Sequence, residues 1–522
     1  MNDEYYDYEE ILEPVHTEEK EEEIKLPTIV QNWERVSVSY SRHNNIPAII
    51  TFYSLLGDLV KNFVEVPWGE TSTDTRIHFC WIQTARSGKT TLIMYVLNPV
   101  AKRIYEELKD DPYISDATVL NFADYNTASL VGSHILNVDA DGRSQFDSNA
   151  EQNYTDEVLR LTEADMHPDD RAMLLEVARN TLERTKDRWL IEKGPIDGQG
   201  VWIADEFEGS GVFKEKNHKE NMNILFQTIM NNFHSGSHLY EKVLTGKPTI
   251  ELDCKYTVIA CTFPPEYLLK TVAEKGVLQR FLPFIWEVPD KILTQMRVDV
   301  LGGFGTVGER KGPPLQMTKG FLELYKLTKA RFEHMGKDKT RTVTYHPSAK
   351  DAILLEHKVL LQEIAEVQPK IRNIIRLFEM NLCEYIGKIA VLNAIASAPD
   401  VPTHEKFIVA VKHVKQAAKV VRACYGTLVL WLENAIKIKQ STIITKNGGQ
   451  EFQQAYKVAL SRAKPHEKLE EGYVLKKLVI DEACKILKKS QRMIKYRFKN
   501  VESLFEEEKR GREVFIRLIQ EE

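Results

Sequence analysis

The segment that most constrains the fold is a glycine-containing turn between an apolar run and a helix-compatible stretch. Residues 77–82 (IHFCWI) predict a buried parallel strand, and residues 91–97 suit a helix. The turn matches the phosphate-binding pattern G-x-x-x-x-G-K-[ST], except that Gln83 replaces the first glycine. The alternative interpretation of this segment is an ordinary serine-glycine turn before a surface lysine. The motifs further along the chain distinguish the two interpretations.

In a phosphate-binding loop each residue of this turn has a chemical task. Backbone N–H groups and the helix N-terminus cradle phosphate, Lys89 supplies a point charge, and the Thr90 hydroxyl can ligate Mg²⁺. The candidate nucleotide-binding residues are therefore Ser87, Gly88, Lys89, Thr90 and Thr91.

An apolar run followed by two acids is the second motif. Residues 201–204 (VWIA) lead directly into Asp205 and Glu206. Hydrolysis of a phosphate anhydride needs one carboxylate at a strand tip for the Mg²⁺ shell and a neighbour that polarises the attacking water. Asp205 fits the first role and Glu206 the second. A strand that runs into an exposed acidic loop is the alternative, which the position after the phosphate loop disfavours.

Three further apolar runs complete an expected parallel sheet, at residues 117–122, 256–262 and 284–289. Thr262 ends the second run, where its hydroxyl could sense a γ-phosphate or simply cap the strand. Arg280 stands among apolar residues before the last run. It could stabilise transition-state charge in a neighbouring subunit's site, or form a salt bridge at a helix end.

Other segments of this half of the chain predict helices and an insertion. Apolar residues recur at helical spacing over 46–66, which predicts a packing helix before the first strand. Residues 138–170 are rich in Asp, Asn and Ser and predict an insertion or long loop, followed by an amphipathic helix at 171–190. A helix at 224–233 precedes a probable hairpin at 239–252.

Residues 316–436 are predominantly helical by their apolar spacing and follow a Gly/Pro-rich connection. Such a segment would form a helical lid beside the nucleotide site. Arg372 and Arg376 lie one turn apart, and either could reach a phosphate, although each could also be purely structural.

The last part of the chain predicts two helices and a hairpin. The helices span 475–487 and 491–501, and the strands 504–508 and 514–518. This is a winged-helix pattern, in which basic residues contact groove and phosphates; a protein-binding wing with a solvated basic face is the alternative. The candidate DNA contacts here are Arg492, Lys495, Arg497, Lys499, Lys509, Arg510 and Arg512.

Composition excludes several classes of protein. The chain has 522 residues and a formal net charge of −6, so no overall basic character announces nucleic acid. Its six cysteines include no C-x-x-C pair, which argues against zinc modules and a disulfide framework and for a reducing, intracellular setting. We expect no signal peptide and no membrane span. Residues 1–26 are strongly acidic and predict a disordered tail or an acidic docking peptide for replication partners.

Together these motifs resemble the AAA+ helicase-type ATPases, specifically the minichromosome maintenance branch and related helicase-like ATPases of phages, viruses and mobile elements. Residues 204–208 (ADEFE) are similar to the Walker B block of that branch, and residues 276–281 (GVLQRF) to its arginine-finger block. Residues 375–379 (IRLFE) are similar to the helix around its second sensor. The resemblance covers roughly residues 75–435 and the C-terminal architecture.

The resemblance implies a ring, a homo-hexamer, that binds ATP and Mg²⁺ between subunits. Lys89, Thr90, Asp205 and Glu206 would come from one subunit and Arg280 from its neighbour. The hairpin at 239–252 corresponds to a pore-facing hairpin, which makes Lys242 and Lys247 candidates to grip single-stranded or forked DNA.

Several departures mark the chain as a reduced, divergent relative, more typical of a virus or phage in a prokaryotic host. Gln83 breaks the glycine signature, the interval between Lys89 and Asp205 is long, and Thr262 or Phe263 stands where a sensor asparagine is usual. The first arginine of the second sensor is only approximately matched, and no large DNA-binding or zinc-binding domain precedes the ATPase.

The expected fold class is α/β: a P-loop AAA+ ATPase core with a helical lid and a C-terminal winged-helix domain. The expected order is an acidic tail, a helical segment, the ATPase core, the lid, a linker and the winged helix, at 1–26, 27–74, 75–300, 301–436, 437–449 and 450–522.

Two functions fit these motifs equally. One is an ATP-dependent DNA helicase or translocase in replication, and the other an ATP-switched initiator or helicase loader that binds DNA without unwinding it. A packaging motor is disfavoured because no nuclease-like carboxylate cluster follows the ATPase.

Overall fold

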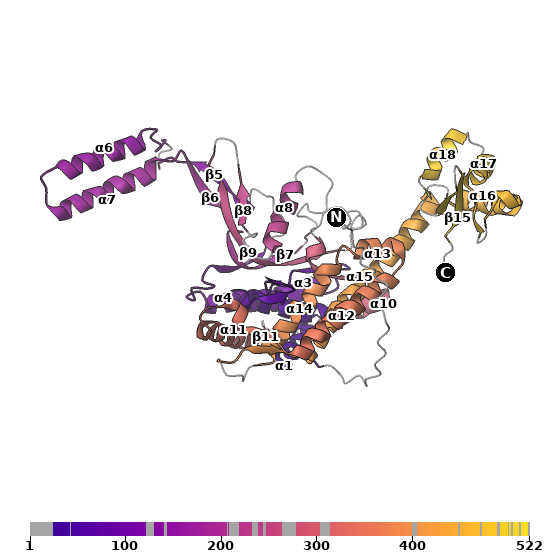
Figure 1. Ribbon diagram of the computed structural model, residues 1–522, viewed down its shortest axis with the longest axis horizontal. Helices are drawn as coiled ribbons and strands as arrows, with labels where there is room; N and C mark the ends of the chain where they lie inside the picture. The colour runs from indigo at the N-terminus through magenta and orange to yellow at the C-terminus, as the bar shows by residue number, and fades with distance from the viewer. Residues whose placement is uncertain are drawn as a thin grey trace, which may run out of the picture. The chain divides into compact units, whose positions relative to one another are not determined.

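A computed structural model gives the architecture of the chain (Figure 1). Two compact units are present, one formed by residues 1–264, 272–367 and 372–425 and the other by 265–271, 368–371 and 426–522. The structure describes residues 25–519 except for residue 42 and residues 122–129, 140–142, 206, 208–218, 232–238, 244–246, 264–277, 303–313, 399–403, 447–448, 470–471, 488–490, 500, 503–504 and 511–512.

The first unit is built on a mostly parallel β-sheet, so the expected α/β class is confirmed at this level. Five parallel strands lie in the order β10-β3-β9-β7-β4, and β8 pairs antiparallel with β9. The strands are β3 (Phe79–Gln83), β4 (Ala117–Asn121), β7 (Gly198–Ala204), β8 (Leu239–Lys242), β9 (Ile250–Thr262) and β10 (Leu282–Trp286). Since all five are parallel, their carboxyl ends meet at one edge.

The segment expected as a hairpin at 239–252 differs from the prediction in one respect. Its second strand does not end at residue 252 but continues as the 13-residue strand β9, which also contains the predicted strand 256–262. Val258 to Thr262 are all buried, because this part of β9 pairs with β3 on one side and, as far as Ala260, with β7 on the other.

Helix α2 (Asn45–Val60) packs across the sheet and is buried from Pro47 to Val60. It follows α1 (Thr28–Tyr40) and comes so close to the chain before β3 that a Cβ on Gly57 would lie 2.2 Å from the Thr75 carbonyl oxygen. Only glycine permits this approach, because even a methyl group would overlap backbone.

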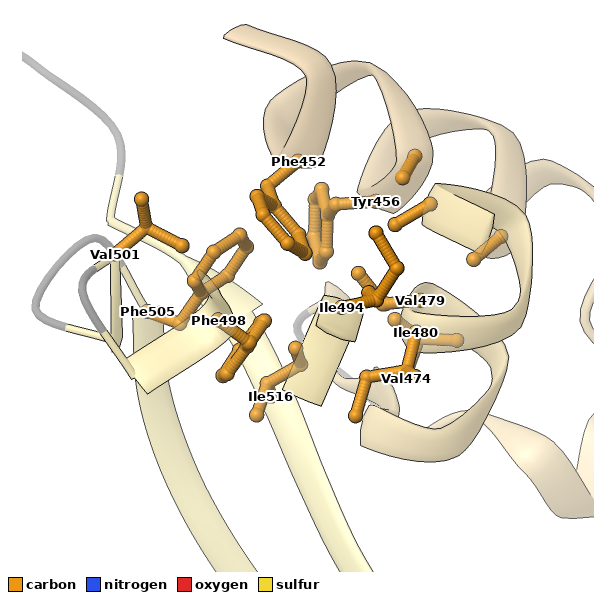
Figure 2. Close-up of a cluster of buried hydrophobic side chains, with 13 residues drawn as sticks. Phe452, Tyr456, Val474, Val479, Ile480, Ile494, Phe498, Val501, Phe505 and Ile516 are labelled. Carbon is orange, nitrogen blue, oxygen red and sulfur yellow. The ribbon is translucent and has the colours of Figure 1, made fainter. Parts of the chain in front are cut away.

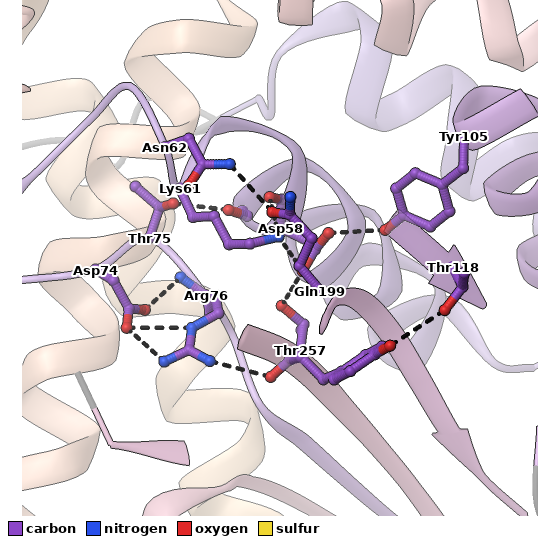
Figure 3. A network of polar contacts seen from close by, with 12 residues as sticks. Asp58, Lys61, Asn62, Asp74, Thr75, Arg76, Tyr105, Thr118, Gln199 and Thr257 are labelled. Carbon is purple, nitrogen blue, oxygen red and sulfur yellow. Dashed lines mark hydrogen bonds and ion pairs between the residues drawn. The ribbon is translucent and has the colours of Figure 1, made fainter. Parts of the chain in front are cut away.

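A buried polar network ties α2 to the sheet (Figure 3). The Asp58 carboxylate lies 2.9 Å from the Lys61 ammonium and accepts hydrogen bonds from Tyr105 (2.7 Å) and Thr257 (2.9 Å). Each of these polar atoms therefore has a partner, which offsets much of the cost of burying a charge pair.

After β3 the chain forms α3 (Lys89–Leu92), a π-helical turn at Ile93–Leu97 and α4 (Asn98–Glu107). Further along, α8 (Lys219–Met230) packs on β9. Helix α10 (Asp290–Gly302) precedes the region expected to be helical. That region contains α11 (Gln316–His334), α12 (Pro347–Glu366), α13 (Pro369–Ile375), α14 (Glu379–Ala396) and α15 (Val411–Lys446), which runs past its expected end. A small parallel pair, β11 (Val343–Tyr345) and β12 (Phe407–Val409), lies within it.

The predicted insertion is more regular than a long loop. Strands β5 (Gly132–Leu136) and β6 (Trp189–Lys193) form an antiparallel ribbon, and α6 (Ala150–Glu163) and α7 (Pro168–Thr185) pack on each other between them (Figure 1). The polar composition hid α6, whose Tyr154, Val158 and Leu161 nevertheless recur at helical spacing.

The second unit has its own small core (Figure 2). Helices α16 (Gly449–Arg462), α17 (Lys476–Leu487) and α18 (Gln491–Lys499) accompany an antiparallel sheet of order β13-β15-β14. Its strands are β13 (Val474–Leu475), β14 (Phe505–Arg510) and β15 (Glu513–Leu518). The segment expected as a linker at 437–449 is largely helical, since α15 runs to Lys446.

None of the helices in the described ranges is long and apolar enough to cross a membrane.

Candidate functional site

The loop after β3 is shaped by one glycine and by the chain before α2. Gly88 has φ = 87°, and a Cβ there would lie 2.4 Å from the Ser41 hydroxyl. That hydroxyl donates a 2.7 Å hydrogen bond to the Gly88 carbonyl oxygen. A side chain at this position would therefore be strained by both conformation and contact.

The buried side chains of Asn44 and Gln83 hydrogen-bond each other and the loop backbone. We name this pair the loop clamp. The Gln83 amide donates to Asn44 Oδ1 (2.9 Å), and the Asn44 amide donates to the Ser87 carbonyl oxygen (2.9 Å). Gln83 also accepts a hydrogen bond from the Trp81 indole, and both clamp residues are fully buried. Thus the residue that breaks the glycine signature has a structural task that sequence reasoning missed.

Lys89 opens α3 and is turned back toward the loop. Its ammonium donates to the carbonyl oxygens of Gln83 (2.5 Å) and Thr84 (3.3 Å) and lies 4.9 Å from the centre of the Phe263 ring. Burial lowers the pKa of Lys89, and the negative charge of Asp205 acts against that shift. Lys89 and Asp205 are therefore close enough for their charges to interact.

Thr262 ends β9 between the strands that lead to Lys89 and Asp205. In the β3–β9 register it stands opposite Ile82, and in the β7–β9 register Ala204 stands opposite Ala260. The Thr262 side chain is 1% exposed, and within the described chain nothing hydrogen-bonds its hydroxyl. A buried unsatisfied hydroxyl costs about 1–3 kcal/mol, which a polar ligand could recover.

The predicted phosphate- and Mg²⁺-binding residues of the loop differ in exposure. Ser87 is buried with its hydroxyl on the Thr84 carbonyl oxygen (2.6 Å), while Thr90 is exposed and Thr91 half-buried. Over the ranges given above, no group of three or more His, Cys, Asp or Glu side chains could hold a metal alone. Mg²⁺ bound with a nucleotide needs no such cage, because phosphate and water supply most ligands. Glu206 lies outside the described residues.

Arg280 lies at the opposite edge of the sheet from Lys89. It precedes β10, whose first residue pairs with Phe79, whereas Lys89 follows the other end of β3. Five residues of strand separate the two edges, which is roughly 17 Å. Burial lowers the pKa of Arg280, which lines a cavity of about 260 Å³ together with His78 and Tyr385.

Helix α14 holds the backbone beside Arg280. The Tyr385 hydroxyl lies 2.5 Å from the Arg280 carbonyl oxygen and 3.2 Å from that of His78, and Asn381 donates to the Gln279 carbonyl oxygen. Sequence reasoning gave no sign of these positioning contacts, because they join residues about one hundred positions apart.

The two arginines of the helical region are not brought to the loop by any described contact. The Arg372 guanidinium donates two hydrogen bonds, of 2.9 and 3.1 Å, to the Val367 carbonyl oxygen at the end of α12. Arg376 follows α13 and is exposed.

The predicted DNA-gripping lysines contact the β5–β6 ribbon. Lys242 donates to the Gly132 carbonyl oxygen (3.3 Å), and the Lys247 ammonium lies 3.9 Å from the centre of the Trp189 ring. Both side chains are half-buried. These contacts give each lysine a structural role within its own chain.

The basic residues of the second unit divide between a helix and a hairpin. Lys495 and Lys499 are exposed on α18, which also carries Arg492 and Arg497. On the hairpin, Lys509 and Arg510 are exposed, and Arg512 is outside the described residues. The hairpin also carries a run of acids, and three of them form ion pairs: Glu506 with Arg517, Glu507 with Lys476 and Glu508 with Arg510.

No protein-family model matches this chain, and no curated protein resembles it significantly.

Proposed function

We propose that this protein is an ATP-dependent DNA helicase or translocase of the AAA+ type that works in viral or phage DNA replication as an oligomeric ring. One observation carries the proposal: Lys89, Asp205 and Thr262 follow or end three adjacent parallel strands at the same sheet edge. At that edge the buried Thr262 hydroxyl has no partner among the described residues.

The expected roles follow from this arrangement. Backbone N–H groups from Ser87 to Thr91 would hold the phosphates of ATP, and Lys89 would leave the loop carbonyls for the β/γ oxygens. Thr90 and Asp205 would hold Mg²⁺, and Glu206 would polarise the attacking water. The nucleotide supplies the phosphoanhydride that is cleaved.

Arg280 would complete the site of a neighbouring subunit. The separation of roughly 17 Å along β3 is too large for an arginine side chain to bridge within one subunit. A ring of identical subunits would bring the Arg280 edge of one chain to the nucleotide edge of the next.

DNA binding is proposed for the second unit as a winged helix. In its support, α17 and α18 precede a two-stranded wing, and β13 completes the sheet. From residue 449 onward the chain holds 17 basic and 13 acidic residues. Lys495 and Lys499, exposed on α18, are the contacts that this proposal favours most.

An ATP-switched initiator or helicase loader is the second candidate, and one observation favours it. Lys242 and Lys247, which a translocating hairpin would use to hold a strand, are engaged by the β5–β6 ribbon. A loader needs DNA binding and ATP turnover but no gripping hairpin.

Displacement of a labelled strand from a forked duplex, with Mg²⁺ and ATP, tests the proposal. Glu206→Gln is the control, because it should bind ATP without hydrolysing it. Displacement by the native chain alone supports the motor. ATP hydrolysis without displacement would favour the loader, and absence of nucleotide binding would overturn both.

A further inference from the structure

The β5–β6 ribbon and its two helices, residues 132–139 and 143–193, form a surface that we name the arm. Large apolar side chains that are at least about a third exposed gather on it. They are Ile135, Leu136, Val138, Phe146, Leu159, Met173, Val177, Leu190 and Ile191. Scattered exposed apolar residues are normal, but such a concentration marks an interaction surface.

Among the described elements, the two arm helices pack mainly on each other. They contact each other far more than any other element, and α7 buries none of its residues. Met173 and Val177 are one turn apart on α7 and are 58% and 55% exposed. Since most helical stability comes from burying an apolar face, a helix pair of this kind gains by docking.

Both faces of the ribbon carry exposed apolar side chains, although the chain after β8 contacts one of them. Lys247 packs on Trp189, and His134 hydrogen-bonds the Pro248 carbonyl oxygen (2.7 Å). Ile135 and Leu190 pair across the strands on the opposite face and are 45% and 40% exposed. On the face of Trp189 and His134, Leu136 and Ile191 are 51% and 38% exposed.

The charge of the arm excludes nucleic acid as its occupant. Residues 150–185 carry nine acidic and four basic side chains, so phosphate would be repelled. The rest of the chain carries the opposite net charge. Outside residues 1–26 and 137–188 the chain holds 61 basic and 52 acidic residues.

We propose that the arm docks on a second copy of this chain, whose residues outside 1–26 and 137–188 carry a net positive charge. The proposal deepens the proposed function and rests on its oligomeric assembly. The arm helices have 14 and 18 residues and are therefore about 21 and 27 Å long. One face of the pair covers roughly 500 Å², a large part of the ~800 Å² per partner in a stable interface.

The ribbon register offers a clean truncation. Leu136 and Trp189 are a closing pair, so a two-residue Asn-Gly turn can replace residues 137–188 without touching the central sheet. A milder variant, Leu159→Gln/Met173→Gln/Val177→Thr, removes apolar surface without changing charge. Its matched control, Thr162→Gln/Ala172→Gln/Asn180→Gln, changes exposed arm positions that are not large and apolar.

Sedimentation velocity over a protein concentration series, with Mg²⁺ and ATP, measures subunit association. We expect the truncation and the apolar variant to raise the subunit Kd by about tenfold or more and the control to leave it unchanged. Added salt should also weaken the native association. A truncated chain that associates as tightly as the native one, or a native chain that stays monomeric, would overturn the proposal.

ATP hydrolysis and strand displacement on the same samples separate the two proposals. Arm-dependent association without nucleotide turnover leaves the arm assigned and removes the motor. If ATP is hydrolysed but association does not depend on the arm, the motor is supported and the role of the arm is rejected.

Discussion

The Gln83 side-chain amide donates a 2.9 Å hydrogen bond to Asn44 Oδ1, and this contact joins the strand before the phosphate loop to the start of α2. Asn44 passes the connection on to the Ser87 carbonyl oxygen. The loop is therefore held by a residue 39 positions upstream, in the segment expected only to pack against the core.

Asn44→Ala should weaken ATP binding by about tenfold, ~1.4 kcal/mol, because buried Gln83 and the Ser87 carbonyl lose their partner. Asn45→Ala is the matched control, since Asn45 is exposed and its amide donates a 2.7 Å hydrogen bond to Glu34, away from the loop. Titration calorimetry with a non-hydrolysable ATP analogue measures both. Equal affinity for native protein and Asn44→Ala would show that the clamp does not shape the site.

Gln83→Gly restores the glycine that the motif lacks, yet it should also weaken ATP binding. It empties a fully buried position and removes the acceptor of the Trp81 indole and the donor to Asn44 Oδ1. We expect a lower melting temperature and a higher Kd for the ATP analogue. Tighter binding of the ATP analogue than in the native chain would mean that Gln83 weakens nucleotide binding and that its hydrogen bonds do not shape the site.

Asn44 and Gln83 show which features of the fold could be predicted from the sequence and which could not. The positions of β3, β7, α17 and α18 along the chain follow apolar periodicity, which the sequence displays directly. The order of the strands in the sheet and helix α16 were not predicted. The clamp could not be foreseen, because its partners are brought together only when α2 packs on the sheet. Of the two arm helices, α7 was expected, at 171–190, and α6 was missed. In α6, polar residues outnumber the few apolar residues that pack it on α7.

A glycine pair tests the packing of α2 on the core. Gly57→Ala should destabilise the first unit by about 2–3 kcal/mol, since the new methyl would meet the Thr75 carbonyl oxygen at 2.2 Å. Gly387→Ala on α14 meets nothing closer than 3.7 Å and should be neutral or stabilise by up to ~1 kcal/mol. Thermal unfolding of both variants measures this. Similar melting temperatures would contradict the close approach.

The opposite positions of Lys89 and Arg280 lead to a mixing experiment. Lys89→Ala and Arg280→Ala should each abolish ATP turnover alone. In an equal mixture, about a quarter of subunit contacts would combine an intact loop with an intact arginine, so turnover should partly return. Phosphate release from a titration of one variant into the other is the measurement. No recovery in demonstrably mixed assemblies would place both residues in one subunit's site.

Thr262→Val separates a structural from a catalytic threonine. Because the hydroxyl is buried without a partner in the described chain, its loss should leave stability unchanged or raise it by about 1 kcal/mol. If the hydroxyl instead orients water or senses the γ-phosphate, kcat should fall by about 10–100-fold with little change in KM. Melting temperature and steady-state ATP hydrolysis measure the two effects. If the variant is stable and keeps the native kcat, the Thr262 hydroxyl has no catalytic role. If the variant is less stable than the native chain, the hydroxyl makes a hydrogen bond within the chain.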